Sequence, residues 1–462
     1  MLTFRGPGAK LCDGLTRRDA LRIGGLGAFG ATLGLPLAQA GGPATLGRAK
    51  SCIVLFLVGG PAQHSTWDPK PDAPAEVRGP FAPIATKIPG LSLSELMPRT
   101  AKVADKLCVL RAVSTGDNAH SSSGYYMLTG RPHQPMNFEN ANPGAPNDAP
   151  ALGAVLGRVT PAIGGLPRSV TLPHRVANTD GSVWPGQDAG YLGRAVDPWL
   201  LHAQPTADGL LVDEITLPSG LSPERIVGRR DLLDRLGRTL DAIGRDPAAK
   251  ALDVQSRQAI ALLQSREGRA AFRLDEEPAA VRDSYGRNPF GQSVLLAKRL
   301  TEAGVRLVQV NWYRGKDEPG DNPVWDTHKD EPNRLKNVLV PPADAAIASL
   351  IADLDRTGRL DETLVVVLSE FGRSPRLEGN AGRGHWGSVF SVALAGGGIR
   401  GGMAYGSSDK FAAQPREGKV RPEDLMATIF HCLGFAPGHE YRDPLDRPFP
   451  ISRGEVIRAI LA

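Results

Sequence analysis

The stretch Thr363–Trp386, TLVVVLSEFGRSPRLEGNAGRGHW, decides the fold of this chain. Five consecutive apolar residues, 364–368, are rich in β-branched valine, which is typical of a strand buried on both faces of a parallel sheet. Glu370 and Arg373 follow the end of this run, at the edge where open α/β sheets bind ligands. A glycine-rich loop then brings back His385. The stretch predicts a catalytic or metal site, and the alternative is that Glu370 pairs with Arg373 while His385 caps a loop.

The pattern of apolar run, polar loop and helix recurs along the chain. We expect buried strands at 51–58, 107–113, 169–173, 305–310 and 364–368, and helices at 93–106, 151–156, 290–303, 341–357 and from about 125. Strands that alternate with helices are typical of an α/β fold with a doubly wound, mostly parallel central sheet and helices on both faces. Residues of about 222–285 are charged and helical in period. We therefore expect one domain over 50–462 with a helical insertion.

The first 40 residues have the pattern of a twin-arginine signal peptide. Arg17 and Arg18 precede a Gly/Ala/Leu-rich segment, and Ala38-Gln39-Ala40 is a small-x-small cleavage site. The apolar segment is short and broken by glycines, so a permanent membrane helix is the weaker alternative. We expect the twin-arginine machinery to export the folded protein to the periplasm or the cell exterior. We expect no other stretch to be long and apolar enough to span a membrane.

Charge and cysteine content exclude some classes of protein. The formal charge of the whole chain is +5, of which the first 40 residues hold a net +3, leaving +2 for the remainder. This small balance gives no reason to expect a nucleic-acid partner. Beyond the signal, Cys52, Cys108 and Cys432 are an odd number without metal-ligand spacing. Buried thiols are therefore expected instead of a disulfide framework.

Histidines and carboxylates gather in the loops that follow the expected strands. The candidates are His64 and Asp68, His120 and Ser121, Asp326 and His328, and Glu370 with His385. Because parallel strands end at one edge of a sheet, these loops should converge. Imidazole nitrogens and carboxylate oxygens bind divalent cations such as zinc, manganese or calcium. Each residue also has a simpler interpretation, such as a helix cap or a turn, so the prediction depends on the convergence.

Several motifs, taken together, resemble one known family. They are Val58-Gly59-Gly60-Pro61, Asp68-Pro69-Lys70-Pro71, Leu128-Thr129-Gly130-Arg131, Trp325-Asp326-Thr327-His328, Ser369-Glu370-Phe371-Gly372-Arg373, Gly382-Arg383-Gly384-His385 and Leu394-Ala395-Gly396-Gly397-Gly398. From about residue 50 to its end the chain resembles the bacterial exported family named domain of unknown function 1501. That family is similar to the alkaline phosphatase and sulfatase clan, so the resemblance implies the same fold and ester hydrolysis.

The resemblance also implies roles for individual residues. Asp326, His328 and His385 match later metal ligands of the clan by type and order. The clan's Asp after the first strand is absent, because Gly59-Gly60-Pro61 stands there, and His64 or Asp68 could substitute for it. The late Asp-His or Asp-Asn pair is replaced by Glu370-Phe371. The nucleophile position falls on His120, next to Ser121, and no cysteine is present there to become formylglycine.

We therefore expect an exported, metal-dependent hydrolase of phosphate or sulfate esters, which could be small molecules or polysaccharides. Its metal ligands would come from Asp326, His328, Glu370, His385, His64 and Asp68. His120 or Ser121 would act as the nucleophile or general acid/base, unless a metal-activated water is the nucleophile, and Arg373 would clamp the oxyanion. The alternatives are a non-catalytic exported binding or surface-complex protein on the same fold, and a redox or other metalloprotein.

Overall fold

The computed structural model describes residues 46–160, 166–206, 209–212, 270–314 and 322–462. The expected signal peptide therefore lies outside the described residues. The same is true of most of the expected helical insertion, since 213–269 are not described.

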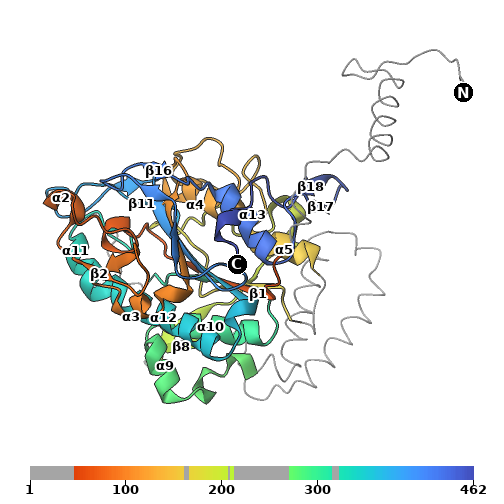
Figure 1. Cartoon of the computed structure of the whole chain (residues 1–462). Coiled ribbons are helices and arrows are strands. Elements are labelled where there is room, and N and C mark those ends of the chain that lie inside the picture. Colours follow the sequence, from red (N-terminus) through yellow and green to blue (C-terminus); the bar gives the residue numbers. More distant parts are fainter. Residues whose placement is uncertain (1–45, 161–165, 207–208, 213–269, 315–321) are drawn as a thin grey trace, which may run out of the picture. The chain divides into compact units, whose positions relative to one another are not determined.

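An eight-stranded sheet forms the centre of the fold, in the order β14-β4-β13-β10-β1-β9-β5-β6 (Figure 1). Its central strand β1 (Ser51–Phe56) lies between β10 (Thr363–Leu368) and β9 (Leu307–Asn311) and is parallel to both. All six residues of β1 and all six of β10 are buried. The prediction that 364–368 form a strand buried on both faces is confirmed.

The sheet is parallel except for one strand. Strand β13 (Phe390–Ala395) runs antiparallel to both of its neighbours, β10 and β4 (Leu107–Val113). The outer strands are β14 (Met403–Tyr405), β5 (Ser169–Leu172) and β6 (Trp199–Leu200), each parallel to the strand beside it. The predicted α/β fold with a mostly parallel sheet is thus confirmed.

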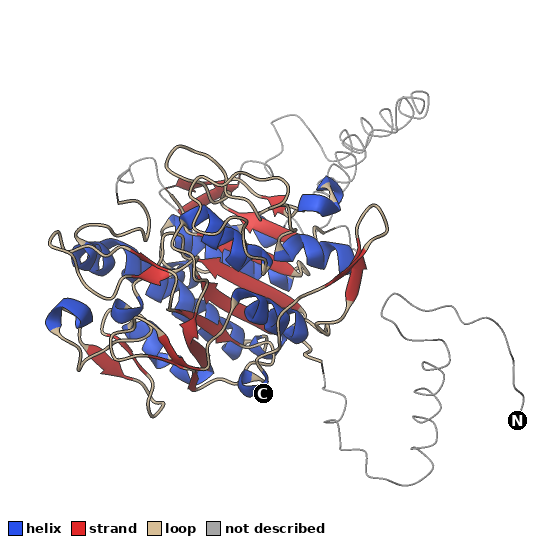
Figure 2. Cartoon of the chain, turned by 90° about the horizontal axis from the view of Figure 1, so that it is seen from above, coloured by secondary structure: helices blue, strands red, loops and turns tan. Residues whose placement is uncertain are grey.

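Helices cover both faces of the sheet. Figure 1 shows α10 (Pro289–Glu302) and α12 (Val340–Arg356) on one side and α13 (Pro422–Cys432) and α5 (Leu152–Val159) on the other. Helix α12 also packs against α3 (Pro98–Lys102) and α9 (Ala279–Tyr285), and α13 packs against α4 (His120–Thr129). Figure 2 shows the helices lying over the strands when the molecule is seen from above. The sheet is enclosed because its strands carry apolar side chains on both faces.

Smaller elements connect these. The short helices are η1 (Gln63–Ser65), α2 (Ala75–Arg78), η2 (Ala104–Lys106), η3 (Gly190–Leu192), η4 (Arg194–Val196), η6 (Leu274–Glu276), α11 (Glu331–Arg334), η7 (Leu335–Leu339), η8 (Leu360–Glu362) and η9 (Arg458–Ile460). The strand pairs outside the central sheet are β2 (Pro83–Ala85) with β3 (Ser92–Ser94), β7 (Ala203–Thr206) with β8 (Gly209–Val212), β11 (Gly372–Arg373) with β12 (His385–Trp386), β15 (Ser407–Ser408) with β16 (Pro415–Glu417), and β17 (Glu440–Arg442) with β18 (Pro448–Pro450).

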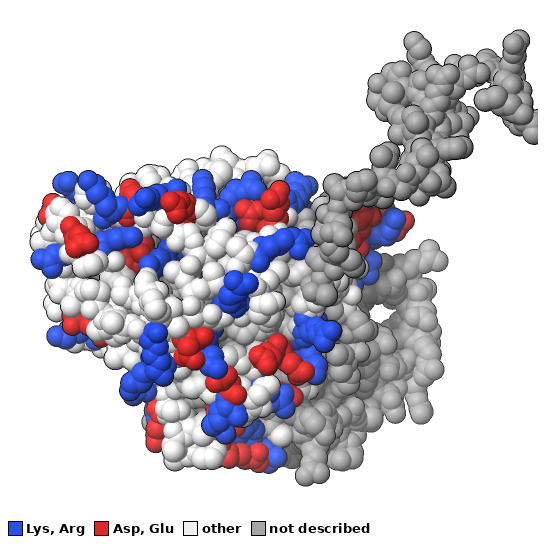
Figure 3. Space-filling model, viewed as in Figure 1, with Lys and Arg blue, Asp and Glu red and all other residues white. Residues whose placement is uncertain are grey.

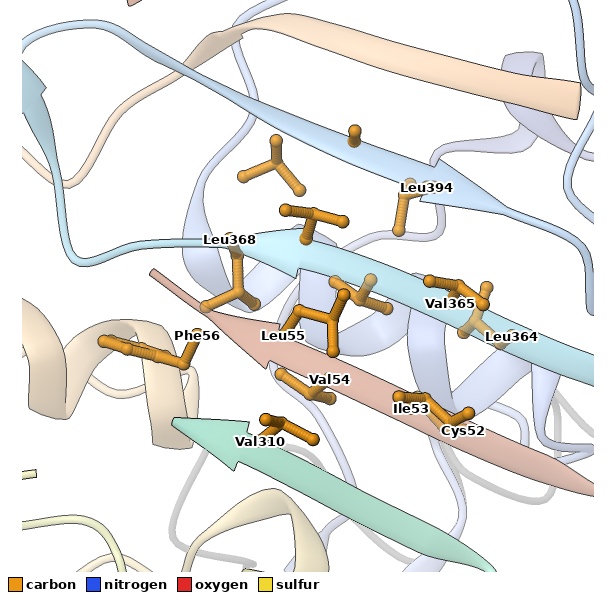
Figure 4. Packing of buried hydrophobic residues seen from close by; sticks show 14 of the residues in the cluster. Cys52, Ile53, Val54, Leu55, Phe56, Val310, Leu364, Val365, Leu368 and Leu394 are labelled. Atoms are coloured by element: carbon orange, nitrogen blue, oxygen red, sulfur yellow. The ribbon is translucent and has the colours of Figure 1, made fainter. Parts of the chain in front are cut away.

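The core is built from the apolar faces of the central strands. In Figure 4 the side chains of Leu55, Val310, Leu364 and Leu394, from four neighbouring strands, fill the space beside the sheet. Each of these four is at most 1% exposed. The three cysteines beyond the signal are free and buried, as predicted, and burial raises the pKa of the Cys432 thiol to about 12.

Two predicted helices differ from the structure. The segment 93–106 is not one helix, because its first residues belong to β3, which pairs with β2, and α3 begins only at Pro98. Helix α4 begins at His120, five residues before the predicted start. The backbone nitrogen of His120 donates to Glu139 Oε1 at 2.7 Å, so a side chain from a later loop caps this helix. A partner so far along the chain is invisible to local pattern analysis.

One described helix, Glu331–Arg356, is long and apolar enough to cross a membrane by composition, with a mean hydropathy of 1.3. The sequence prediction that no stretch beyond the signal would pass such a test is therefore wrong. However, 61% of its apolar window is buried inside the fold, which is typical of a core helix.

On the face seen in Figure 3, Lys and Arg side chains are interspersed with Asp and Glu.

Candidate metal and active site

The central strands end together, and this alignment creates the site. Phe56 at the end of β1 is level with Leu368 of β10 and Asn311 of β9. The loops that follow these strands, together with the start of α4 after β4, consequently meet at one edge of the sheet. The predicted convergence is confirmed for His120, Asp326, His328, Glu370 and His385, which contact one another there.

Asp326 is the centre of the cluster. Its Oδ2 lies 3.1 Å from His120 Nε2, and its Oδ1 lies 2.9 Å from His328 Nε2 and 3.1 Å from His385 Nε2. The guanidinium of Arg373 also contacts Oδ1. Burial would raise the pKa of Asp326, but Arg373 and His120 outweigh this effect and hold the pKa far below its usual range. The carboxylate is therefore ionised at neutral pH.

His120 is held by carboxylates on both sides of its ring. Its Nε2 faces Asp326, and its Nδ1 lies 2.7 Å from Glu370 Oε1. Burial favours the neutral ring, but Asp326 and Glu370 outweigh it and raise the pKa of His120 to about 10. Trp184 stacks on the ring at 5.8 Å between centroids. Gly124 makes this possible, because a Cβ there would lie 2.5 Å from the Trp184 indole.

His328 and His385 complete the cluster from two further loops. Their Nε2 atoms lie 2.9 Å apart, and the ring of Phe371 stacks on His385 at 4.7 Å. His385 Nδ1 lies 2.7 Å from the backbone carbonyl of Asn118. Burial lowers the pKa of His385, and the charges of His120 and Arg373 lower it further. Asp326 raises this pKa, but its effect is the smaller one. His385 is therefore neutral and can offer a lone pair at Nε2.

These residues fit a divalent metal ion. The ligand atoms of His120, Asp326 and His385 all lie within 4.8 Å of one another, and beside this group His328 Nε2 lies 2.9 Å from His385 Nε2. In a zinc site with metal–nitrogen bonds of about 2.0–2.1 Å, neighbouring ligand atoms lie roughly 3.3 Å apart, and the three histidine nitrogens lie 2.9–3.1 Å from the oxygens of Asp326. The far nitrogens of His120 and His385 bond to Glu370 and a carbonyl, which is how metal-binding histidines are usually oriented. A bound cation would displace the His120 Nε2 proton.

Glu370 was expected among the metal ligands, but its contacts are those of a positioning residue. Its side chain is fully buried, and Oε1 accepts hydrogen bonds from His120 Nδ1 and from the backbone nitrogen of Gly59, at 2.8 Å. Its Oε2 lies 2.7 Å from the Ser369 hydroxyl. Glu370 thus contacts a ligand candidate and not the centre of the cluster.

Arg373 has the contacts of a cross-link between loops and not those of an arginine that clamps an oxyanion. It is fully buried, and its Nε donates to the Gly60 carbonyl at 3.0 Å while Nη1 donates to the Arg383 carbonyl at 3.1 Å. Its Nη2 donates to Gly59 and Asp326. The guanidinium therefore fixes Asp326 against the loop after β1.

Three candidates make other contacts. His64 Nε2 donates to the Phe411 carbonyl at 2.9 Å, and Asp68 accepts from Lys70 and Ser408. The Ser121 hydroxyl donates to the Phe138 carbonyl at 3.1 Å and accepts from the Ala141 nitrogen at 3.0 Å. The structure thus brings five of the nine candidates into mutual contact with Arg373 beside them, and turns these three toward neighbouring loops.

Sequence reasoning missed the residues that shape the surroundings of the cluster. Gly59 has a φ of +112°, and a Cβ there would lie 2.4 Å from the Asp326 nitrogen, so this position has no room for a side chain. A cavity of about 370 Å³ opens beside the cluster, lined by His120, Asp326 and His328 together with Trp184 and Arg314. The Gly59-Gly60 pair was visible in the sequence, and the Gly/Trp-containing loop 178–193 suggested a segment that overlies a site, whereas nothing local marks Arg314.

Comparison with known proteins places the chain in a family. Residues 49–461 match the family model described as "Protein of unknown function (DUF1501)". None of the curated proteins matches the chain.

Solved structures with a similar fold have low sequence identity. A protein named Ps i-CgsB has a TM-score of 0.41 and 14% identity, covering 84% of this chain and 72% of its own. The PsFucS1 sulfatase from Pseudoalteromonas sp. has a TM-score of 0.34 and 14% identity, with coverages of 88% and 70%. A protein in the alkaline phosphatase superfamily from Vibrio parahaemolyticus has a TM-score of 0.31 and 11% identity, with coverages of 85% and 71%.

Proposed function

Starting from the membership of this chain in the DUF1501 family, we propose that it is an exported, metal-dependent hydrolase of phosphate or sulfate esters. The single observation that carries the proposal is the convergence of three imidazole Nε2 atoms on the two oxygens of Asp326. Donors of this kind bind zinc or manganese, and the two His–carboxylate and His–carbonyl contacts behind them fix the rings. Export is supported by the twin-arginine pattern at Arg17 and Arg18.

The divalent ion, when bound, would polarise the ester and lower the pKa of a water molecule. The protein's own groups prepare the place for it. Glu370 keeps Nε2 of His120 facing Asp326, and Arg373 keeps Asp326 in position. The cavity beside Asp326 and His328 gives an ester access to the cluster, and the Arg314 side chain on its wall can attract an anionic group.

Metal analysis and an ester panel on the exported protein test the proposal. We expect about one zinc or manganese ion per chain and hydrolysis of at least one phosphate or sulfate monoester. The Asp326→Asn and His385→Asn variants should lose both the metal ion and the hydrolytic activity. His439→Asn, which changes an exposed histidine, should lose neither. If the two cluster variants keep their metal and their activity, the proposal fails.

A second function is a non-catalytic exported binding protein on the same fold. The observation that favours it is that Arg373 and His120 already neutralise the negative charge of Asp326, so the carboxylate does not need a metal ion. In addition, the Ser121 hydroxyl next to the cluster is engaged by the 138–141 loop. Protein that contains no metal and hydrolyses no ester, yet binds inorganic phosphate or sulfate, would favour this function.

A further inference from the structure

The cavity beside the cluster continues into a second compartment. This adjoining cavity, of about 340 Å³, shares Val58, Ala177, Asn178, Thr179, Arg314 and Val324 with the first. The first cavity reaches Asp326 and the histidines, whereas the second reaches His174, Arg175 and Trp312. Both lie where β5 and β9 end, so one cleft leads from the cluster along the edge of the sheet.

The chemistry of the two compartments differs. The first is lined by His120, Asp326 and His328 and by the polar side chains of Glu139 and Asn140. The second has an apolar wall that includes Trp312 and two guanidinium groups, Arg175 and Arg314. Within the described part of the chain, no carboxylate lies within 4.0 Å of either guanidinium. Two arginines beside an apolar wall suit an anionic group on an organic body.

The loops that carry the two arginines are held by partly buried hydrogen bonds. His174 Nε2 accepts a hydrogen bond from the Arg314 backbone nitrogen at 3.1 Å, and its Nδ1 lies 3.0 Å from the Arg175 carbonyl. The side chain of Asn311, at the end of β9, donates to the His174 carbonyl at 2.7 Å. The loops after β5 and β9 are therefore tied together, and the basic compartment stays at a fixed position relative to the cluster.

The wall between the two compartments is also held in place. Asn178 Oδ1 accepts a hydrogen bond from the Trp184 indole at 2.6 Å, and its Nδ2 donates to Asn140 Oδ1 at 3.1 Å. Since Trp184 stacks on His120, this wall links the cluster to the loop that carries Arg175. A ligand that spans the cleft would therefore meet preformed surfaces at both of its ends.

We propose that this cleft selects an extended ester with a second anionic group, which Arg175 and Arg314 bind while the reacting phosphate or sulfate lies at the cluster. The inference rests on the proposed function for the identity of the reacting group. Beyond the proposed function, the inference states that the substrate carries at least two anionic groups and extends from one compartment into the other. Small esters with a single charge would leave the basic compartment unused.

Calorimetric binding to the zinc-loaded protein tests this inference. The probes are alkanediyl bisphosphates of increasing chain length, each paired with the alkyl monophosphate of the same length. We expect one chain length at which the bisphosphate binds about tenfold more tightly, the effect of one charge-assisted contact. Arg314→Gln or Arg175→Gln should remove this preference, whereas Arg314→Lys should retain part of it.

Arg416→Gln is the matched control, because Arg416 lies in β16, which lines neither cavity, and its side chain is 72% exposed. The preference for the bisphosphate should survive in this variant. Absence of the preference in the unchanged protein, or its survival in both Arg→Gln variants, overturns the inference. A separate measurement shows whether the proposed function fails: the Asp326→Asn variant would then hydrolyse the ester as fast as the unchanged protein. Melting curves that match the unchanged protein establish that each variant is folded.

Discussion

Glu370 Oε1 lies 2.7 Å from Nδ1 of His120, although 250 positions separate the two residues. The same oxygen lies 2.8 Å from the backbone nitrogen of Gly59. One buried carboxylate therefore joins the loops that follow β1 and β10 to the first residue of α4. Through this contact the central strands set the direction in which the imidazole of His120 points.

Replacing Glu370 should weaken metal binding without unfolding the protein. Glu370→Gln keeps an oxygen for Gly59 but removes the charge that orients His120, so we expect metal affinity to fall about 10–100-fold. Competition with a zinc chelator measures this change. Glu378→Gln, at an exposed position in the loop before His385, serves as the control. Unchanged affinity in Glu370→Gln would show that the contact with His120 does not position the ring for metal.

Arg373 should matter for folding more than for ligand binding. Arg373→Gln leaves the carbonyls of Gly60 and Arg383 and the Asp326 carboxylate without a buried partner. We expect the free energy of unfolding to fall by about 3–5 kcal/mol, as for other broken buried ion pairs. Chemical denaturation measures it, and the exposed Arg376→Gln is the control. A loss of activity with unchanged stability would instead support the oxyanion-clamp role.

Ser121 should be dispensable for turnover. Its hydroxyl bonds to the Phe138 carbonyl and the Ala141 nitrogen, so Ser121→Ala removes contacts with a loop and not with the cluster. We expect kcat to stay within a few-fold and stability to fall by about 1 kcal/mol, the usual value of a lost hydrogen bond. Steady-state kinetics on the ester found by the panel check this. A fall in kcat of several orders of magnitude would identify the hydroxyl as the nucleophile.

His64 should make the protein sensitive to acid. Burial and the charge of Arg383 lower the pKa of His64 to about 3 from its usual value of 6.5, and its Nδ1 is buried without a partner. In the unfolded chain the ring takes up a proton below pH 6.5, which the native ring does not. Its contribution to stability is thus complete above that pH and is lost as the pH falls from 6.5 toward 3.

The loss expected from His64 is about 1.4 kcal/mol of unfolding free energy for each pH unit in that window. Denaturation at a series of pH values measures the slope, and His64→Gln should reduce it. His439→Gln is the control, since that histidine is exposed. An equal slope in all three proteins would mean that the His64 ring is protonated in the folded state.

The strands were the part of the fold that could be predicted. Runs such as 52–58 and 364–368 are apolar at every position, and only a sheet covered on both faces can bury them. Parallel strands of this kind end at a common edge, so the polar loops behind them could be expected to meet. The antiparallel direction of β13 could not be predicted, because a buried strand has the same composition in either direction.

The sequence by itself determined which loops meet at the site, because strand ends fix the loops that carry His120, Asp326, His328, Glu370 and His385. Only the tertiary structure decided what each of them does. Glu370 and Arg373 are buried behind the ligand atoms, whereas Ser121 turns toward the 138–141 loop. The physical reason is that a loop's sequence specifies a charge or a hydroxyl but not its direction, which depends on hydrogen-bond partners in other loops, 17 positions away for Ser121 and Phe138 and 250 for Glu370 and His120.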